Sequence, residues 1–121
     1  MALVLCTGRD RGLLETRRMI LENAGHMVVQ AATEPEVVAA CEGHKFDVAV
    51  IGQAVSPAGK QGLASRIRER CQSVKILELY APYQGKTIPD ADAWLEVPAA
   101  VPSDLVERVA ELARQDQGAK R

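Results

Sequence analysis

The feature that most constrains this chain is an alternation between short apolar runs and segments with helical periodicity. Asp47 to Gly52 is the clearest run, because the four residues between its ends are all apolar, as expected of a strand buried on both faces. Four further segments are predicted strands: Leu3 to Cys6, Met27 to Ala31, Val74 to Tyr80 and Ala93 to Val97. Since such strands pair in parallel through right-handed crossovers, the pattern predicts an α/β fold with helices on both faces of one sheet.

The helices between these strands have recognisable ends. Asp10 is a predicted N-cap for a helix that runs to about Ala24, where Gly25 can adopt the left-handed conformation that ends it. Residues 33–36 (Thr-Glu-Pro-Glu) form a predicted capping box for a second helix that ends near Gly43. A third helix is expected from about Lys60 to Arg70 and a last one from Ser103, while the first helix is expected to bury Leu14, Leu21 and Ala24 and to turn Arg17, Arg18 and Glu22 elsewhere.

Length and charge limit the classes of protein that fit. A chain of 121 residues suits one domain, expected over residues 1–115 with a polar tail at 116–121. Its 15 basic and 16 acidic residues give a formal net charge of -1, which argues against an electrostatic nucleic-acid binder. No apolar stretch is long enough to span a membrane, so we expect a cytoplasmic protein without a membrane partner.

The cysteines and histidines show no metal-binding or catalytic spacing. Cys6, Cys41 and Cys71 are far apart and odd in number, and none belongs to a Cys-x-x-Cys pair. They are therefore expected to be small buried thiols in a reducing compartment, without a disulfide or a metal. His26 and His44 have no partners at ligand spacing, so both are expected in surface loops.

Several segments resemble the receiver domains of response regulators, and together they cover almost the whole chain. The matching segments are residues 13–15 through 24–26 with 28–29, 46–51, 62–63 before 67–68, and 94–98. The resemblance implies a flavodoxin-like, five-stranded parallel sheet in the order 2-1-3-4-5 and a role in two-component (phosphorelay) signalling of the bacterial type. Only ten residues separate Ala81 from Asp92, and they include Pro82, Gly85 and Pro89. The family's fourth helix is therefore expected to be shortened or absent.

The sequence departs from the family pattern at every position of the phosphorylation site. The family uses an acidic pair to hold Mg²⁺, an acceptor Asp, a Thr or Ser, and a Lys before a proline. In this chain the acidic pair falls on Gly8 and Arg9 with Asp10 as the nearby acid, the acceptor on Gly52, the Thr or Ser on Tyr80, and the Lys on Val97 before Pro98. We therefore expect a pseudo-receiver that is not phosphorylated, has no metal, cofactor or catalytic residue, and is not an enzyme.

Two functions remain open from the sequence. The first is a protein-interaction module, whose partner or second copy docks on the 82–92 loop, the fifth strand and the last helix, with Tyr83, Trp94 and Glu96 as candidate contacts. For Tyr83 and Trp94, packing against the last helix is the equally weighted alternative. The second function is a sensor of a small anionic ligand, bound in the crevice at the carboxyl ends of the strands by Arg9, Gly52 and Gln53.

Overall fold

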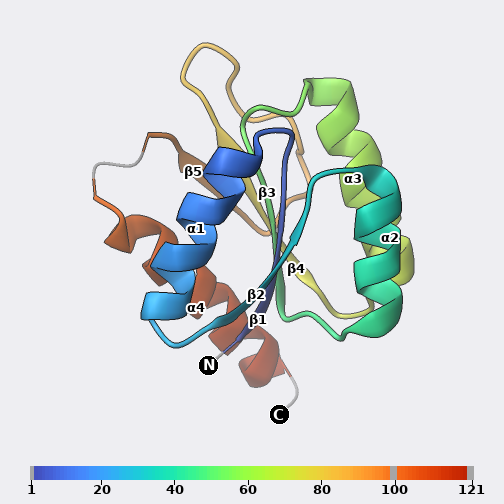
Figure 1. Ribbon diagram of the computed structural model, residues 1–121, viewed down its shortest axis with the longest axis vertical. Helices are drawn as coiled ribbons and strands as arrows, with labels where there is room; N and C mark the ends of the chain where they lie inside the picture. The colour runs from blue at the N-terminus through green and yellow to red at the C-terminus, as the bar shows by residue number, and fades with distance from the viewer. Residues whose placement is uncertain (1, 99–100, 120–121) are drawn as a thin grey trace.

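Five parallel strands form one sheet with helices on both faces in the computed structural model, which describes residues 2–98 and 101–119 and side chains as far as Gln115 (Figure 1). The strand order is β2-β1-β3-β4-β5, so the predicted flavodoxin-like fold is confirmed. The elements follow one another as β1 (Leu3–Thr7), α1 (Arg11–Asn23), β2 (Met27–Ala31), α2 (Glu34–Gly43), β3 (Val48–Ile51), α3 (Pro57–Arg70), β4 (Lys75–Tyr80), β5 (Ala93–Glu96) and α4 (Ser103–Ala119).

The sheet divides the apolar core into two clusters. Helices α2 and α3 cover one face, and α1 and α4 cover the other (Figure 1). Successive side chains of a strand point to opposite faces, so Leu5 packs with the α2–α3 side and its neighbours Val4 and Cys6 pack with the α1–α4 side. Both clusters contain Val, Leu, Ala and Cys, and the isoleucines and Phe46 lie on the α2–α3 side.

Two helix limits differ from the sequence-based expectation. Helix α3 begins at Pro57, about one turn earlier than predicted, because the Ser56 hydroxyl accepts the Gly59 N–H at 3.1 Å and caps the helix there. Helix α4 continues in its backbone to Ala119, beyond Gln115, where the polar tail was expected to begin.

The connection between β4 and β5 contains turns and no helix over residues 81–92, as the short spacing predicted. A buried carboxylate holds this loop in place. Both oxygens of Glu78 accept the Thr87 N–H at 3.0 Å, and one of them also accepts the Ile88 N–H at 2.9 Å. Glu78 Oε2 additionally accepts the Thr87 hydroxyl at 2.6 Å. A side chain of β4 therefore anchors the loop that stands where the family resemblance implies a fourth helix.

Lys60 of α3 completes this network from the other side. Its Nζ lies 2.9 Å from Glu78 Oε2, and both side chains are fully buried. The same ammonium donates to the Leu79 carbonyl at 2.8 Å and to Gln84 Oε1 at 3.0 Å, so its three protons have three acceptors. Buried charges are tolerated when paired and hydrogen-bonded in this way.

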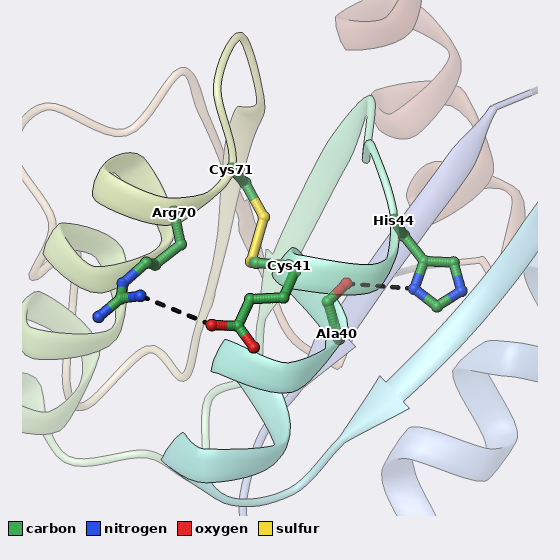
Figure 2. Close-up of a disulfide and its surroundings, with 6 residues drawn as sticks. Ala40, Cys41, His44, Arg70 and Cys71 are labelled. Carbon is green, nitrogen blue, oxygen red and sulfur yellow. Dashed lines mark hydrogen bonds and ion pairs between the residues drawn. A yellow bond between two sulfur atoms is a disulfide. The ribbon is translucent and has the colours of Figure 1, made fainter.

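A disulfide joins Cys41 to Cys71, which makes the prediction of three free thiols wrong (Figure 2). Helices α2 and α3 pack side by side and bring the two Cα atoms to 5.3 Å, a contact between residues 30 apart that spacing along the chain does not reveal. Nearby, Arg70 Nη1 lies 3.7 Å from Glu42 Oε2 and adds an ion pair between the same two helices. Cys6 is a buried free thiol, as predicted.

No helix among the described residues has the length and hydropathy that a bilayer crossing requires.

Candidate functional site

The parallel sheet brings the residues at the predicted phosphorylation positions to one edge, beyond the carboxyl ends of the strands. Thr7 pairs with Ile51 in the β1–β3 ladder, so the next residues, Gly8 and Gly52, lie side by side. The Gly52 N–H donates to the Thr7 carbonyl at 2.8 Å, and a Cβ on Gly8 would lie 3.7 Å from the Gly52 Cα. Crevices at this edge are the usual binding sites of open α/β sheets.

Tyr80 and Val97 form a second adjacent pair at the same edge. The Val97 N–H donates to the Tyr80 carbonyl at 2.9 Å, immediately after the β4–β5 ladder ends. The structure therefore places all four of these aligned positions at strand ends, and none of them carries a carboxylate or an ammonium group.

Asp10, the acid next to these positions, is used to begin α1. Its Oδ1 accepts the N–H groups of Gly12 and Leu13 at 2.9 and 3.1 Å, which confirms the predicted N-cap. Within the described part of the chain, no group of three or more His, Cys, Asp and Glu side chains is arranged to hold a metal ion. Mg²⁺ binds through oxygen ligands, and Asp10 supplies the carboxylate nearest to Gly8 in sequence.

Arg17 of α1 is the residue at this edge that sequence reasoning missed. It was predicted to face away from the core, but it is buried, with 9% of its surface exposed. Its Nη2 donates to Gln53 Oε1, and its Nη1 would lie 3.0 Å from a Cβ placed on Gly52. The guanidinium therefore occupies the space into which a side chain at Gly52 would extend.

The helical period contains a signal that identifies Arg17. Leu14 and Leu21 are both buried on α1, and Arg17 stands between them at the i+3 position of the same stripe. Ala24, which was assigned to the stripe, is instead exposed beyond the end of the helix. The prediction that Arg17 faces away from the core is therefore wrong, and its helical position gives the reason.

The surroundings of Arg17 are electrostatically unusual. Burial lowers the pKa of its guanidinium from the ordinary value, and Cys6 and Asp10 oppose that shift. Burial also raises the pKa of the Cys6 thiol to about 12, so the sulfur is neutral at physiological pH. Among the described side chains, no carboxylate lies within ion-pair distance of Arg17. Five other arginines do have carboxylate partners: Arg11, Arg18, Arg66, Arg68 and Arg70.

The predicted anion-binding residues do not share one cavity. Arg9 lines an open cleft of about 790 Å³ between the β1–α1 loop and the first turns of α3. Gln53 lines a separate pocket of about 280 Å³ together with Arg17, on the α1–α4 side of the sheet. Gly52 lies next to Arg17 and lines neither space.

The candidate partner residues have different environments. Tyr83 is 89% exposed in the 81–92 loop, and Glu96 is exposed at the end of β5. Trp94 is half-buried against the α2–α3 cluster, not against the last helix, and its Nε1 donates to the Ile88 carbonyl at 3.2 Å. Lys86 Nζ lies 4.8 Å from the centre of the indole. Trp94 is therefore part of the loop's own packing, while Tyr83 projects from it.

Comparison with solved structures identifies the fold. An adenylate cyclase from Rhodopirellula baltica superposes with a TM-score of 0.85 at 17% identity, covering 98% of this chain and 92% of that one. A CheY-like receiver domain protein from Methanospirillum hungatei gives 0.81 at 22% identity, covering 98% of both chains. The Thermotoga maritima response regulator TrrA, solved with Mg²⁺ and beryllofluoride, gives 0.76 at 20% identity, covering 93% of this chain and 99% of that one.

No protein-family model matches the sequence, and no curated protein matches it either. At these identities the likeness is one of architecture. The chain has the fold of a response-regulator receiver domain.

Proposed function

We propose that this protein is a phosphorylation-independent pseudo-receiver that acts as a protein-interaction module in bacterial two-component regulation, in the cytoplasm. The observation that carries the proposal is the position of the Arg17 guanidinium beside Gly52. The position aligned with the phosphoacceptor has no side chain, and a guanidinium lies 3.0 Å from where its Cβ would be.

The ligand chemistry of the edge supports the same conclusion. Phosphoryl transfer to a carboxylate requires Mg²⁺, which takes oxygen ligands in near-octahedral geometry. Gly8 and Arg9 offer no carboxylate, and Asp10 Oδ1 already accepts two backbone N–H groups. We assign no catalytic residue and no metal ligand to this chain.

The 81–92 loop supports an interaction surface with one fixed shape. Glu78 accepts hydrogen bonds from Thr87 and Ile88, and Lys60 donates one to Gln84, so buried and partly buried charge-assisted hydrogen bonds attach the loop to β4 and α3. Tyr83, at 89% exposure, is presented on this support. A partner or a second copy that binds Tyr83 and Glu96 would meet the same surface at all times.

Phosphorylation independence is tested by amide NMR before and after addition of Mg²⁺ with beryllofluoride, a mimic of an aspartyl phosphate. We expect no movement of the Gly8, Gly52 and Tyr80 resonances. The Thermotoga maritima regulator, which was solved in complex with both reagents, serves as the positive control. Saturable shifts at these three residues would overturn the proposal.

The interaction role is tested first on the chain itself by sedimentation equilibrium over a wide concentration range. If a second copy is the partner, the average mass rises with concentration, and Tyr83→Ser weakens the association while Tyr80→Ser does not. If the average mass stays at the monomer value at every concentration, a homodimer is excluded and the partner is a different protein.

A sensor of a small anion is the second candidate function. The observation that favours it is the buried positive charge of Arg17, which has no carboxylate partner among the described side chains.

A further inference from the structure

We propose that the pocket between α1 and the start of α4 binds a small organic monocarboxylate, with Arg17 as the group that receives its charge. The inference develops the second candidate function, and it transfers the anion-binding role from Arg9 to a residue on the other face of the sheet. It does not depend on the interaction role of the 81–92 loop.

The first argument is charge balance. A buried cation is costly unless an opposite charge and hydrogen bonds compensate it. Lys60, the other buried cation, has Glu78 at 2.9 Å, whereas the hydrogen-bond partner of Arg17 among the described residues is the neutral amide of Gln53. Asp10 acts on the guanidinium only from beyond ion-pair distance, and a bound carboxylate would place an opposite charge in direct contact through the bidentate geometry that arginine favours.

The second argument is the shape and polarity of the pocket. Its volume is about 280 Å³, near the lower end of small-molecule sites. Arg17 and Gln53, which are hydrogen-bonded to each other, form its polar end, and Thr16 is the other polar lining residue. Apolar side chains line it from three directions: Leu13 and Ile20 of α1, Leu79 and Leu95 of the sheet, and Leu105 of α4. This arrangement suits a ligand with one charged group and a compact apolar body, such as a benzene ring or a short branched chain.

Gln53 adds a second donor at the polar end. Its Oε1 accepts from Arg17, which leaves Nε2 as a donor that makes no hydrogen bond to another described residue. A carboxylate has two oxygens that each accept hydrogen bonds, so the guanidinium and the amide together match its requirements.

The larger cleft beside Arg9 is a weaker anion site for the same physical reason. Arg11, which lines it, pairs with Glu36 at 3.2 Å, and Glu34, which also lines it, pairs with Arg66 at 3.2 Å. Arg11 and Glu34 are therefore already paired, and Arg9 and Arg11 are exposed to water, where ion pairs contribute little.

The test is an amide NMR titration of the whole chain with benzoate, phenylacetate and hexanoate. Benzyl alcohol serves as the neutral control and inorganic phosphate as the anion without an apolar body. We expect saturable shifts at Leu13, Gln53 and Leu105 with at least one carboxylate. Benzyl alcohol and phosphate should bind at least about tenfold more weakly, as expected when one of two contact types is lost.

Two variants locate the site. Arg17→Gln should weaken carboxylate binding by about ten- to a hundredfold, the range for hydrogen bonds to a charged partner, while Arg18→Gln should leave it unchanged. Thr16→Trp keeps the guanidinium and fills the pocket from an exposed position of α1, so it should abolish binding even if Arg17→Gln fails to fold.

Three results overturn the inference: no saturable shift with any of the three carboxylates, phosphate binding as tightly as they do, or unchanged carboxylate binding in Thr16→Trp. The beryllofluoride experiment reports on Gly8, Gly52 and Tyr80 independently. A chain that binds beryllofluoride and benzoate would therefore lose the pseudo-receiver proposal and keep the carboxylate pocket, and the reverse result is equally distinguishable.

Discussion

Replacing Lys60 by Met isolates the contribution of the buried ion pair, because methionine fills most of the same volume without the charge. The variant loses the three hydrogen bonds that the Lys60 ammonium donates: to Glu78 Oε2 at 2.9 Å, to the Leu79 carbonyl at 2.8 Å and to Gln84 Oε1 at 3.0 Å. Glu78 keeps its donors from Thr87 and Ile88, so its charge is partly compensated in the variant.

The expected loss is large on the scale of the whole domain. Removing one partner of a buried pair costs about 3–5 kcal/mol, and the donors that remain to Glu78 favour about 3–4 kcal/mol for Lys60→Met. A chain of this length has a total unfolding free energy of about 6–18 kcal/mol. With a urea m-value of about 2 kcal/mol/M, the unfolding midpoint should fall by about 1.5–2 M.

The assay is urea unfolding at pH 7, followed by circular dichroism, with Lys45→Met as the control at an exposed lysine. Native-state hydrogen exchange gives a second readout, because the Thr87 and Ile88 amides should exchange faster once the network loosens. The double variant Lys60→Met with Glu78→Gln should be less destabilised than the two single changes added together.

The pH dependence of the unfolding free energy provides a second check on the contribution of Glu78. Burial raises the pKa of the Glu78 carboxyl, but the hydrogen bonds from Thr87, Lys60 and Ile88 outweigh it and hold that pKa below the ordinary glutamate value. The stabilisation by ionised Glu78 is fully present above the ordinary glutamate pKa and is lost as the pH falls through the lower, folded-state pKa.

Two results would refute the reasoning about Lys60→Met. They are a loss of unfolding free energy below about 1 kcal/mol at pH 7, and unchanged hydrogen exchange at the Thr87 and Ile88 amides.

Three further predictions test other parts of the structure. Reducing the Cys41–Cys71 bridge should lower the unfolding free energy by about 3.6 kcal/mol, the loop-entropy value for a separation of 30 residues. Urea unfolding with and without reductant measures this, and identical curves would mean that the thiols are not bridged. Gly62→Ala should raise the thermal midpoint, since a helical Cβ there meets open space and gains about 0.5–1 kcal/mol, whereas Gly59→Ala should not, because its Cβ would lie 2.9 Å from a valine methyl. Burial lowers the pKa of His26, whose Nδ1 accepts a backbone N–H, so its contribution is present above the ordinary histidine pKa and lost as the pH falls through the lower folded value. A stability profile from pH 8 to pH 5 that is the same for His26→Gln would contradict this.

Patterns that depend on periodicity were predictable from the sequence. The five apolar runs specified the strands, their alternation with helices specified a parallel sheet, and the spacing from Ala81 to Asp92 excluded a full fourth helix. The caps at Asp10 and Thr33 were also predictable, since each hydroxyl or carboxylate accepts from N–H groups two or three residues further along the chain.

Contacts between distant elements were missed, and the burial of two charged helical residues was not predicted. Cys41 meets Cys71 because α2 and α3 pack together, which no local pattern reveals. Arg17 follows Leu14 by three positions, and Lys60 precedes Ala64 by four, so both charges stand on buried stripes. Arg17 was predicted to face away from the core, and no prediction was made for the burial of Lys60, because only apolar residues were assigned to the buried stripes.

The two faces of the sheet differ in the interactions that hold their helices, so we expect the helices of one face to be more rigid than those of the other. On one side a covalent bond between α2 and α3 and a buried ion pair between α3 and β4 oppose separation of the elements. On the other side, among the described residues, α1 and α4 are joined by apolar packing, with neither a disulfide nor an ion pair between them. Thermal fluctuations of the backbone should therefore be larger in α1 and α4 than in α2 and α3. A molecule bound between these two helices would damp that motion without reshaping the loop that carries Tyr83.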